Sequence, residues 1–173
     1  MRTSQYEDLL ISETDGQFYF IDVSNPTAPV EIHQPTYAHN DYYVDQNTGK
    51  MFVAKNDSIV VWDLDNNFTT VASTYFGFLQ NFNCLTVHND TIYAYVTNQG
   101  LVRYIYDGAN TITQDTIINL PHGSPKYMAA DRFGLYLCYI EEGLFAYNKQ
   151  TLEETSWYEH GLEFITWVAI AFE

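Results

Sequence analysis

Short apolar runs, each closed by a polar residue, recur along the whole chain. A run that ends in Asp or Asn occurs four times, as FYFID, VVWD, YIYD and LFAYN. The polar ends of these runs lie 41, 44 and 41 residues apart, at Asp22, Asp63, Asp107 and Asn148. A second set of strand ends, at Asp45, His88 and Asp131, has intervals of 43 and 43 residues. Two sets with nearly the same period predict a repeat protein with units of about 40 residues.

Each unit contains four short segments of strand character, which we name a to d in chain order. They are rich in Tyr, Phe, Val, Ile and Thr and are separated by Gly, Asn and Asp, which favours strands joined by tight turns. In units two to four the predicted strands are residues 41–45, 50–55, 58–63 and 68–75, then 83–88, 91–97, 101–107 and 112–120, then 126–131, 135–140, 144–148 and 153–158.

Four strands per unit and a period near 40 predict an all-β fold, a β-propeller with four blades of four antiparallel strands. The chain opens on a predicted b strand at residues 6–13 and closes on a predicted a strand at residues 164–172. We therefore expect one domain over residues 1–173, in which the C-terminal strand completes the N-terminal blade, since this removes open sheet edges. The predicted blades are residues 6–34 plus 162–173, 40–76, 82–120 and 125–159.

Such closure predicts a monomer. The alternative is that the chain is a fragment of a larger propeller or half of a paired one. In that case it would self-associate or form part of a longer chain.

The stretch FIDVSNPTAPVEI, within residues 17–32, resembles the LVIVD-type repeat of bacterial and archaeal propeller proteins. The other copies, VVWDLDNN, YIYDGANT and AYNKQT, keep the strand and its polar end but lack the Ser-Asn-Pro corner. The resemblance implies a propeller fold. It also implies a cell-surface or extracellular location, because many proteins with this repeat are expected there. It implies no catalytic residues.

Composition limits the classes of partner. Apolar residues make up 46% of the chain, which is typical of a globular protein. The formal net charge of −15 disfavours nucleic acid and anionic membrane surfaces. A protein, a peptide or a glycan remains compatible with it, and the acidity also keeps a Tyr-rich surface soluble. No apolar run reaches the 18 residues that would predict a membrane span. The N-terminal MRTSQYEDLL has no apolar signal region, so a native N-terminus would predict a cytoplasmic protein.

Two residue classes are expected to be structural. Cys84 and Cys138 lie inside apolar strands and are predicted to be small buried core residues, with a disulfide as the alternative. The recurring Asp and Asn at the c–d corners could form a ring of ligands. The favoured interpretation is that they accept backbone N–H groups in the corners, as these residues do in turns.

Three histidines give the strongest hint of a site. His39, His122 and His160 all lie in connections from a d strand to the next a strand, and in a propeller these connections share one face around the channel. Together they could hold a transition metal, or one of them could act as an acid or base. The alternative is that they are turn and packing residues. The third unit has Phe82 at the corresponding position.

The predicted binding site on this face combines the histidines with neighbouring aromatic and polar residues: His39, His122, His160, Asn40, Tyr37, Phe82 and Glu163. Asn81, Lys126, Glu141 and Glu142 are expected on the same face. Aromatic and amide side chains together suit peptides or sugars. No nucleophile elbow, phosphate loop, dinucleotide fingerprint or metalloprotease motif is present in the sequence.

The first functional hypothesis is a non-enzymatic module that binds a ligand or protein at this channel mouth, without a cofactor. A metal-dependent or histidine-dependent hydrolase or lyase at the same face, with a divalent metal, is the second. A structural domain of a larger surface protein is the third. A propeller fold serves all three classes, so the fold alone does not choose among them.

Overall fold

The computed structural model describes residues 2–14, 17–33, 39–75 and 81–158. Within these ranges every helix or strand element is a β-strand, and the strands form four sheets. The sheets contain, in chain order, β1 (Arg2–Tyr6), β2 (Leu9–Thr14), β3 (Gln17–Asp22) and β4 (Val30–His33); β5 (Asp41–Asp45), β6 (Lys50–Ala54), β7 (Ser58–Asp63) and β8 (Thr69–Tyr75); β9 (Phe82–His88), β10 (Thr91–Val96), β11 (Gly100–Tyr106) and β12 (Ile112–Ile118); and β13 (Tyr127–Ala130), β14 (Leu135–Tyr139), β15 (Gly143–Tyr147) and β16 (Glu154–Tyr158).

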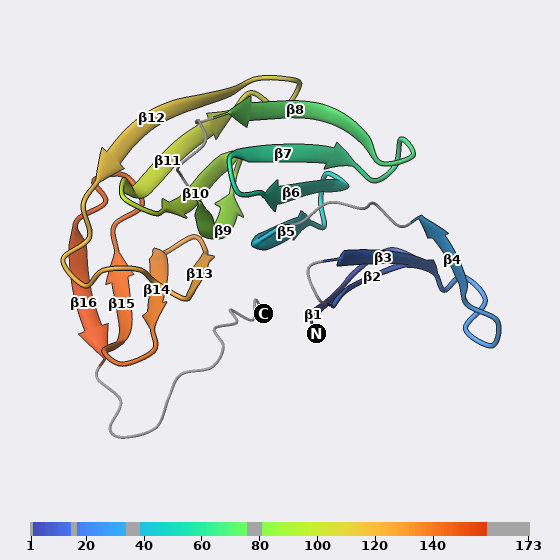
Figure 1. The fold of residues 1–173 in the computed structure, drawn as a ribbon, viewed down its shortest axis with the longest axis horizontal. Coiled ribbons are helices and arrows are strands. Elements are labelled where there is room, and N and C mark those ends of the chain that lie inside the picture. Colours follow the sequence, from blue (N-terminus) through green and yellow to red (C-terminus); the bar gives the residue numbers. More distant parts are fainter. Residues whose placement is uncertain (1, 15–16, 34–38, 76–80, 159–173) are drawn as a thin grey trace.

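Each sheet is a four-stranded antiparallel meander in which neighbours in sequence are neighbours in space. The sheets follow one another along an arc, with β5, β9 and β13 on its inner side and β8, β12 and β16 on its outer side (Figure 1). The prediction of an all-β fold with repeated four-stranded units is confirmed. In units two to four the predicted strand ends agree with the observed ones to within two residues. Among the described residues, no strand of the fourth sheet pairs with the first sheet.

The prediction that the first unit lacks its own a strand is wrong. β1 takes that place and pairs with β2, from Arg2 opposite Glu13 to Tyr6 opposite Leu9. The sequence RTSQY has no apolar run, so its pattern does not predict a strand. The first sheet therefore extends from Arg2, and not from residue 6, to His33. The predicted closing strand at residues 162–173 lies outside the described part of the chain.

The c and d strands of every sheet share one irregularity. A β-bulge interrupts their pairing at Phe20/Ile21, Val61/Trp62, Arg103/Tyr104 and Ala146/Tyr147. An extra residue in the outer strand changes which side chains share a face beyond that point. The bulge is thus part of the repeating unit, and in the fourth sheet it decides which side chains of β16 share a face.

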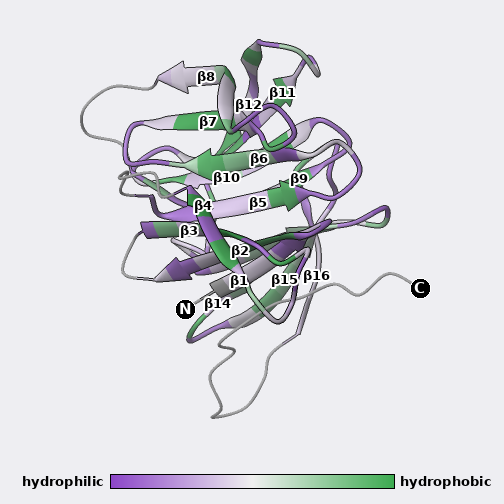
Figure 2. Cartoon of the chain, turned by 90° about the vertical axis from the view of Figure 1, so that its right-hand side faces the viewer, coloured by the Kyte–Doolittle hydropathy of each residue, from purple (hydrophilic) through white to green (hydrophobic). Residues whose placement is uncertain are grey.

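The core is divided among the interfaces between consecutive sheets. One apolar cluster joins the first sheet to the second, another joins the second to the third, and the last joins the third to the fourth. Apolar residues concentrate in the strands, while the connecting turns are hydrophilic (Figure 2). Cys84 and Cys138 are both buried, as the sequence predicts, and neither forms a disulfide bond within the described ranges. Burial raises the pKa of both thiols.

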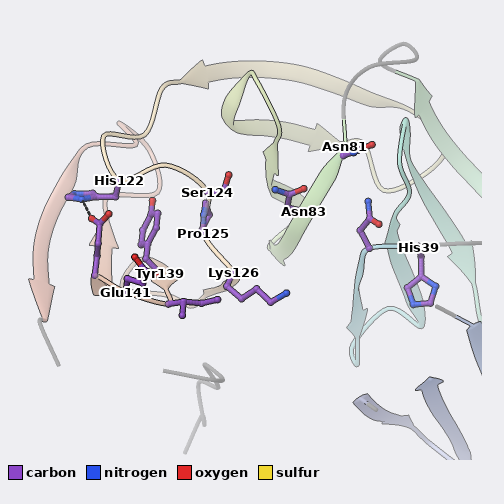
Figure 3. A pocket seen from close by; sticks show the side chains of 12 residues that line it. His39, Asn81, Asn83, His122, Ser124, Pro125, Lys126, Tyr139 and Glu141 are labelled. Atoms are coloured by element: carbon purple, nitrogen blue, oxygen red, sulfur yellow. Dashed lines mark hydrogen bonds and ion pairs between the residues drawn. The ribbon is translucent and has the colours of Figure 1, made fainter. Parts of the chain in front are cut away.

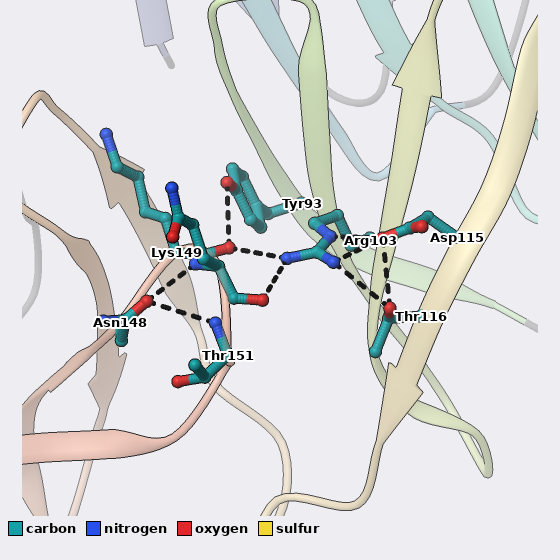
Figure 4. Close-up of polar contacts among 8 residues, drawn as sticks. Tyr93, Arg103, Asp115, Thr116, Asn148, Lys149 and Thr151 are labelled. Carbon is teal, nitrogen blue, oxygen red and sulfur yellow. Dashed lines mark hydrogen bonds and ion pairs between the residues drawn. The ribbon is translucent and has the colours of Figure 1, made fainter.

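Arg103 joins the third sheet to the fourth through polar contacts (Figure 4). Its Nε atom donates to Asp115 Oδ2 at 2.6 Å within the third sheet. Its Nη1 atom donates to the main-chain oxygens of Lys149, at 2.9 Å, and Gln150 in the corner between β15 and β16. A planar guanidinium offers donors in several directions at once, so a single side chain orients this corner against β11.

The c–d corners use the recurring Asp and Asn as predicted. Asp107 Oδ1 accepts the N–H groups of Ala109, Asn110 and Thr111 at 2.8–2.9 Å. Asn148 Oδ1 accepts the next corner's N–H groups in the same way, and Asp22 and Asp63 each accept the N–H two residues on. These side chains stand at the start of the corners and accept the N–H groups that follow, which is the favoured interpretation of the sequence.

We predict that Gly100→Ala is much more destabilising than Gly108→Ala. Both glycines have positive φ, +105° and +78°, which costs a non-glycine residue about 1–3 kcal/mol. A Cβ atom at Gly100 would lie 2.2 Å from the main-chain oxygen of Ile118, whereas one at Gly108 meets nothing within 4 Å. Urea unfolding should therefore show a loss of roughly 3 kcal/mol or more for the first variant and about 1–2 kcal/mol for the second. Equal losses would show that the contact with Ile118 does not matter.

Acid should weaken the corner at Asp107. Hydrogen bonds from the N–H groups of Thr111 and Ala109 lower the pKa of this carboxyl below its usual value. The stability that it provides is complete above about pH 4, the unfolded value, and is lost as the pH falls through the lower folded value. Asp107→Asn keeps the acceptor without the titration, and Asn148→Asp introduces a titrating group into the next corner. Between pH 5 and pH 3 we expect the urea midpoint of Asp107→Asn to fall less than that of the wild type. The urea midpoint of Asn148→Asp should fall more than that of the wild type. The same fall in all three proteins would contradict this assignment.

Candidate functional site

One end of the sheets carries a polar cleft of about 640 Å³ (Figure 3). Because successive strands run in opposite directions, the d–a connections and the b–c turns lie at the same end of every sheet. The cleft is lined by residues from three d–a connections, the start of β9 and the end of β14 with its b–c turn: His39, Asn40, Asn81, Asn83, His122, Ser124, Pro125, Lys126, Tyr139, Ile140, Glu141 and Glu142. This is the face on which the sequence predicts a site.

Asp41 fixes the inner strands that carry the cleft. Its Oδ1 atom accepts the N–H of Tyr42, and its Oδ2 atom accepts the N–H of Leu85 at 2.8 Å. Since Leu85 belongs to β9 and Asp41 to β5, this carboxylate joins the first strands of two sheets. The side chain is therefore used for structure, although the sequence shows it as one of few charged residues on an inner strand.

Three asparagines line the side of the cleft formed by the second and third sheets. Asn40 donates through Nδ2 to Asn56 Oδ1 at 3.2 Å, and Asn83 Oδ1 accepts the hydroxyl of Thr97 at 3.1 Å. The main-chain oxygen of Asn81 accepts the N–H of Thr97 at 2.8 Å. An amide side chain both donates and accepts hydrogen bonds. This side of the cleft therefore suits a neutral polar ligand.

The connection before β13 is tied to both neighbouring strands. The N–H of Lys126 donates to the main-chain oxygen of Cys138 at 2.7 Å, and the Cys84 thiol contacts the main-chain oxygen of Pro125 at 3.5 Å. These contacts set the start of β13 between β9 and β14. They also place Lys126, the cationic residue of the cleft, on its wall (Figure 3).

His122 is held by carboxylates on both sides. Its Nδ1 atom lies 2.6 Å from Glu142 Oε2, and its Nε2 atom lies 3.0 Å from Glu154 Oε2. The ring also packs on Phe145, with 3.9 Å between the ring centroids. A neutral imidazole has one N–H, so only the imidazolium form donates to both carboxylates at once. Both nitrogens of this ring are already engaged within the chain.

Tyr139 forms a buried part of the cleft wall. The residue is 3% exposed, and its hydroxyl makes no hydrogen bond of ordinary geometry among the described residues. The Tyr147 hydroxyl lies near enough to interact with it electrostatically, and burial is the main cause that raises the pKa of Tyr139. This hydroxyl therefore remains protonated at neutral pH.

His39 has a packing role, the alternative that the sequence left open. Its side chain is 2% exposed and stacks on Phe18 of the first sheet, with 3.6 Å between the ring centroids. Its Nε2 atom lies 4.0 Å from Glu13 Oε1. The ring thus helps to join the first sheet to the second at the edge of the cleft.

The other predicted site residues have mixed outcomes. Asn40 is exposed and lines the cleft. Phe82 does not line the cleft in the described structure, because its side chain is fully buried in the cluster between the second and third sheets. Tyr37, His160 and Glu163 lie outside the described residues.

The described residues do not bring histidines together as a metal site. His39 and His122 lie on opposite sides of the cleft (Figure 3). Within the described ranges no three His, Cys, Asp or Glu side chains are placed to share a metal ion. The third member of the predicted set, His160, lies outside those ranges.

Sequence reasoning missed Tyr139 and Glu154 as parts of this region. Tyr139 follows the apolar pattern of a buried strand, and Glu154 belongs to an outer strand, away from the connections. The bulge between β15 and β16 turns the Glu154 side chain toward His122. No residue pattern in the sequence predicts this bulge.

No protein-family model matches the chain, and no curated protein matches it. In the described part of the chain no helix is long and apolar enough to cross a membrane.

We predict that Asp41→Ala destabilises the chain and loosens the inner wall of the cleft. The N–H of Leu85, a buried residue, would lose its acceptor, which costs about 1–3 kcal/mol. Urea unfolding should show this loss, and the amide of Leu85 should exchange with deuterium faster than in the wild type. Asp8→Ala, which removes an exposed carboxylate from the β1–β2 turn, is the matched control with a change within about 0.5 kcal/mol. A Leu85 amide that exchanges at its original rate in Asp41→Ala would contradict the assignment.

Proposed function

We propose that this chain is a non-enzymatic binding module that takes an extended polypeptide segment in the polar cleft. The observation that carries the proposal is the cleft itself, which gathers amide, hydroxyl and ammonium groups from separate connections into one concave surface. Binding sites of this kind are concave and use a few placed polar groups to orient the ligand.

The lining favours a polypeptide over a glycan. Asn40, Asn81 and Asn83 provide amide groups, which match the alternating N–H and C=O groups of an extended main chain. A sugar-binding site usually adds an exposed aromatic ring on which the sugar's apolar face stacks. Tyr139, the aromatic residue that lines the cleft, is buried, and the exposed ring of Trp157 is not part of the cleft lining.

We further propose that the four sheets are the blades of a small propeller of the type that residues 17–32 resemble. Their order in sequence, their arrangement along an arc and the packing of each sheet on the next support this assignment (Figure 1). In such a ring the cleft would form the mouth of the central channel. The hydrolase alternative gains no support from His122, whose two ring nitrogens already contact carboxylates.

The proposal is tested by selection followed by substitution. Peptides of 12 random residues displayed on phage are selected on the full chain, and an oligosaccharide array is probed in parallel. We expect peptide ligands, and the double variant Asn40→Ala/Lys126→Ala should weaken their binding by about tenfold or more, since two hydrogen bonds of about 1 kcal/mol each are lost. Calorimetric titration with the selected peptides gives the dissociation constants.

The matched control is Asn47→Ala, in the β5–β6 turn at the opposite end of the sheet, which should change the dissociation constant less than twofold. Selected peptides that bind both variants as they bind the wild type would disprove the cleft as the site. Sugars that bind where peptides do not would replace the polypeptide with a glycan.

A further inference from the structure

A second concave surface adjoins the cleft on the outer side of the fourth sheet. This groove has a volume of about 340 Å³ and is lined by His122, Glu141, Glu142, Phe145, Glu154 and Trp157. It shares His122, Glu141 and Glu142 with the cleft. A chain that lies in the cleft could therefore extend a side chain into the groove.

Aromatic rings form the floor of the groove. Phe145 and Trp157 are opposite each other on β15 and β16, and their rings stack with 6.3 Å between centroids and 20° between planes. Phe145 is buried beneath the His122 ring, whereas Trp157 is 57% exposed. An exposed indole at the end of a packed row of rings offers a flat surface that the described residues leave open.

The bulge between β15 and β16 adds the carboxylate of Glu154 to this floor. In a regular strand, Glu154 and Trp157 would point to opposite faces because side chains alternate. Ser156 pairs with Ala146 and Glu154 with Tyr147, so one extra residue lies between them and Glu154 joins Trp157 on one face. The tryptophan and a carboxylate are thereby brought to the same groove.

The groove is strongly acidic. Glu141, Glu142 and Glu154 line it, and none of the lining residues within the described ranges is Lys or Arg. The contacts of Glu142 and Glu154 with His122, and of Glu154 with the Tyr147 hydroxyl, all use the Oε2 atoms. The Oε1 atoms are therefore the ones that a second cation would contact. His122 supplies at most one positive charge against three carboxylates.

We infer that the groove binds an arginine side chain of the partner polypeptide, with the guanidinium over Trp157 and its N–H groups on Glu142 and Glu154. A guanidinium stacks on an indole and donates to carboxylates in its own plane, so one group satisfies both features. The charge is complementary, because the whole chain carries −15. This inference rests on the proposed function in one respect, namely that the same partner occupies cleft and groove.

A short peptide tests the groove separately from the cleft. The blocked pentapeptide Gly-Gly-Arg-Gly-Gly is titrated into the full 15N-labelled chain, with its citrulline counterpart as an uncharged probe of the same shape. The indole N–H signal of Trp157 should shift with the arginine peptide. The dissociation constant should be about two- to fivefold lower than for the citrulline peptide, as one exposed cation–π contact implies. Equal binding of both peptides would overturn the inference.

Variants separate a specific site from bulk charge. Glu142→Gln, which can still hydrogen-bond His122, and Trp157→Leu should each weaken the arginine peptide by about fivefold, the latter followed by backbone amide signals. Glu31→Gln makes the same change in net charge on the exposed β4 and should have less than a twofold effect. An equal effect of Glu31→Gln and Glu142→Gln would show attraction by bulk charge only, which overturns the inference.

The outcomes also distinguish the two proposals. If the cleft variant Asn40→Ala/Lys126→Ala loses the selected long peptides but the arginine pentapeptide fails to bind, the proposed function stands and the groove assignment falls. If the pentapeptide binds as expected and the long peptides ignore the cleft variant, the groove stands and the cleft does not.

Discussion

The structure depends on the burial of each sheet's apolar faces against its neighbours. A four-stranded sheet has two faces and cannot cover either of them alone, so each sheet contributes half of a core that the next sheet completes. In the second and third sheets the middle strands are buried at nearly every position, as in β10 and β6. In the first sheet the corresponding β2 has only Ile11 buried, because the described residues pack a neighbouring sheet against one of its faces only.

This packing separates structural residues from those available for binding. Strand residues are committed to the clusters between sheets, and the c–d corners are committed to local hydrogen bonds such as those of Asp107. The connections at the other end meet these demands with fewer residues, such as His39, which packs on Phe18. The remaining positions can therefore carry polar residues with different chemistry. The cleft and the adjoining groove are built from these connections and from one bulged outer strand.

The candidate site could be predicted only in part. The placement of the d–a connections and b–c turns at one end follows from strand alternation, so Asn40, Lys126 and Glu142 were expected on the face where the cleft is found. Whether an individual aromatic or imidazole ring is buried or exposed depends on tertiary packing. His39 stacks on Phe18, and Phe82 fills the core between two sheets, although both occupy connections or strand starts that look alike in sequence.

The sequence by itself determined the strand order, the repeat and the corners, because turns and alternating strands are set by interactions among residues close in the chain. An Asp that accepts three nearby N–H groups does so wherever the sheet lies. The strand character of the polar β1 follows no apolar pattern in its sequence; contacts with the second sheet, such as that of the Tyr6 hydroxyl with the Asp65 carboxylate at 3.1 Å, hold this strand in place. Tertiary structure also decided that Glu154 and Trp157 share a face, because the bulge that reorients them is a property of two paired strands and not of either sequence.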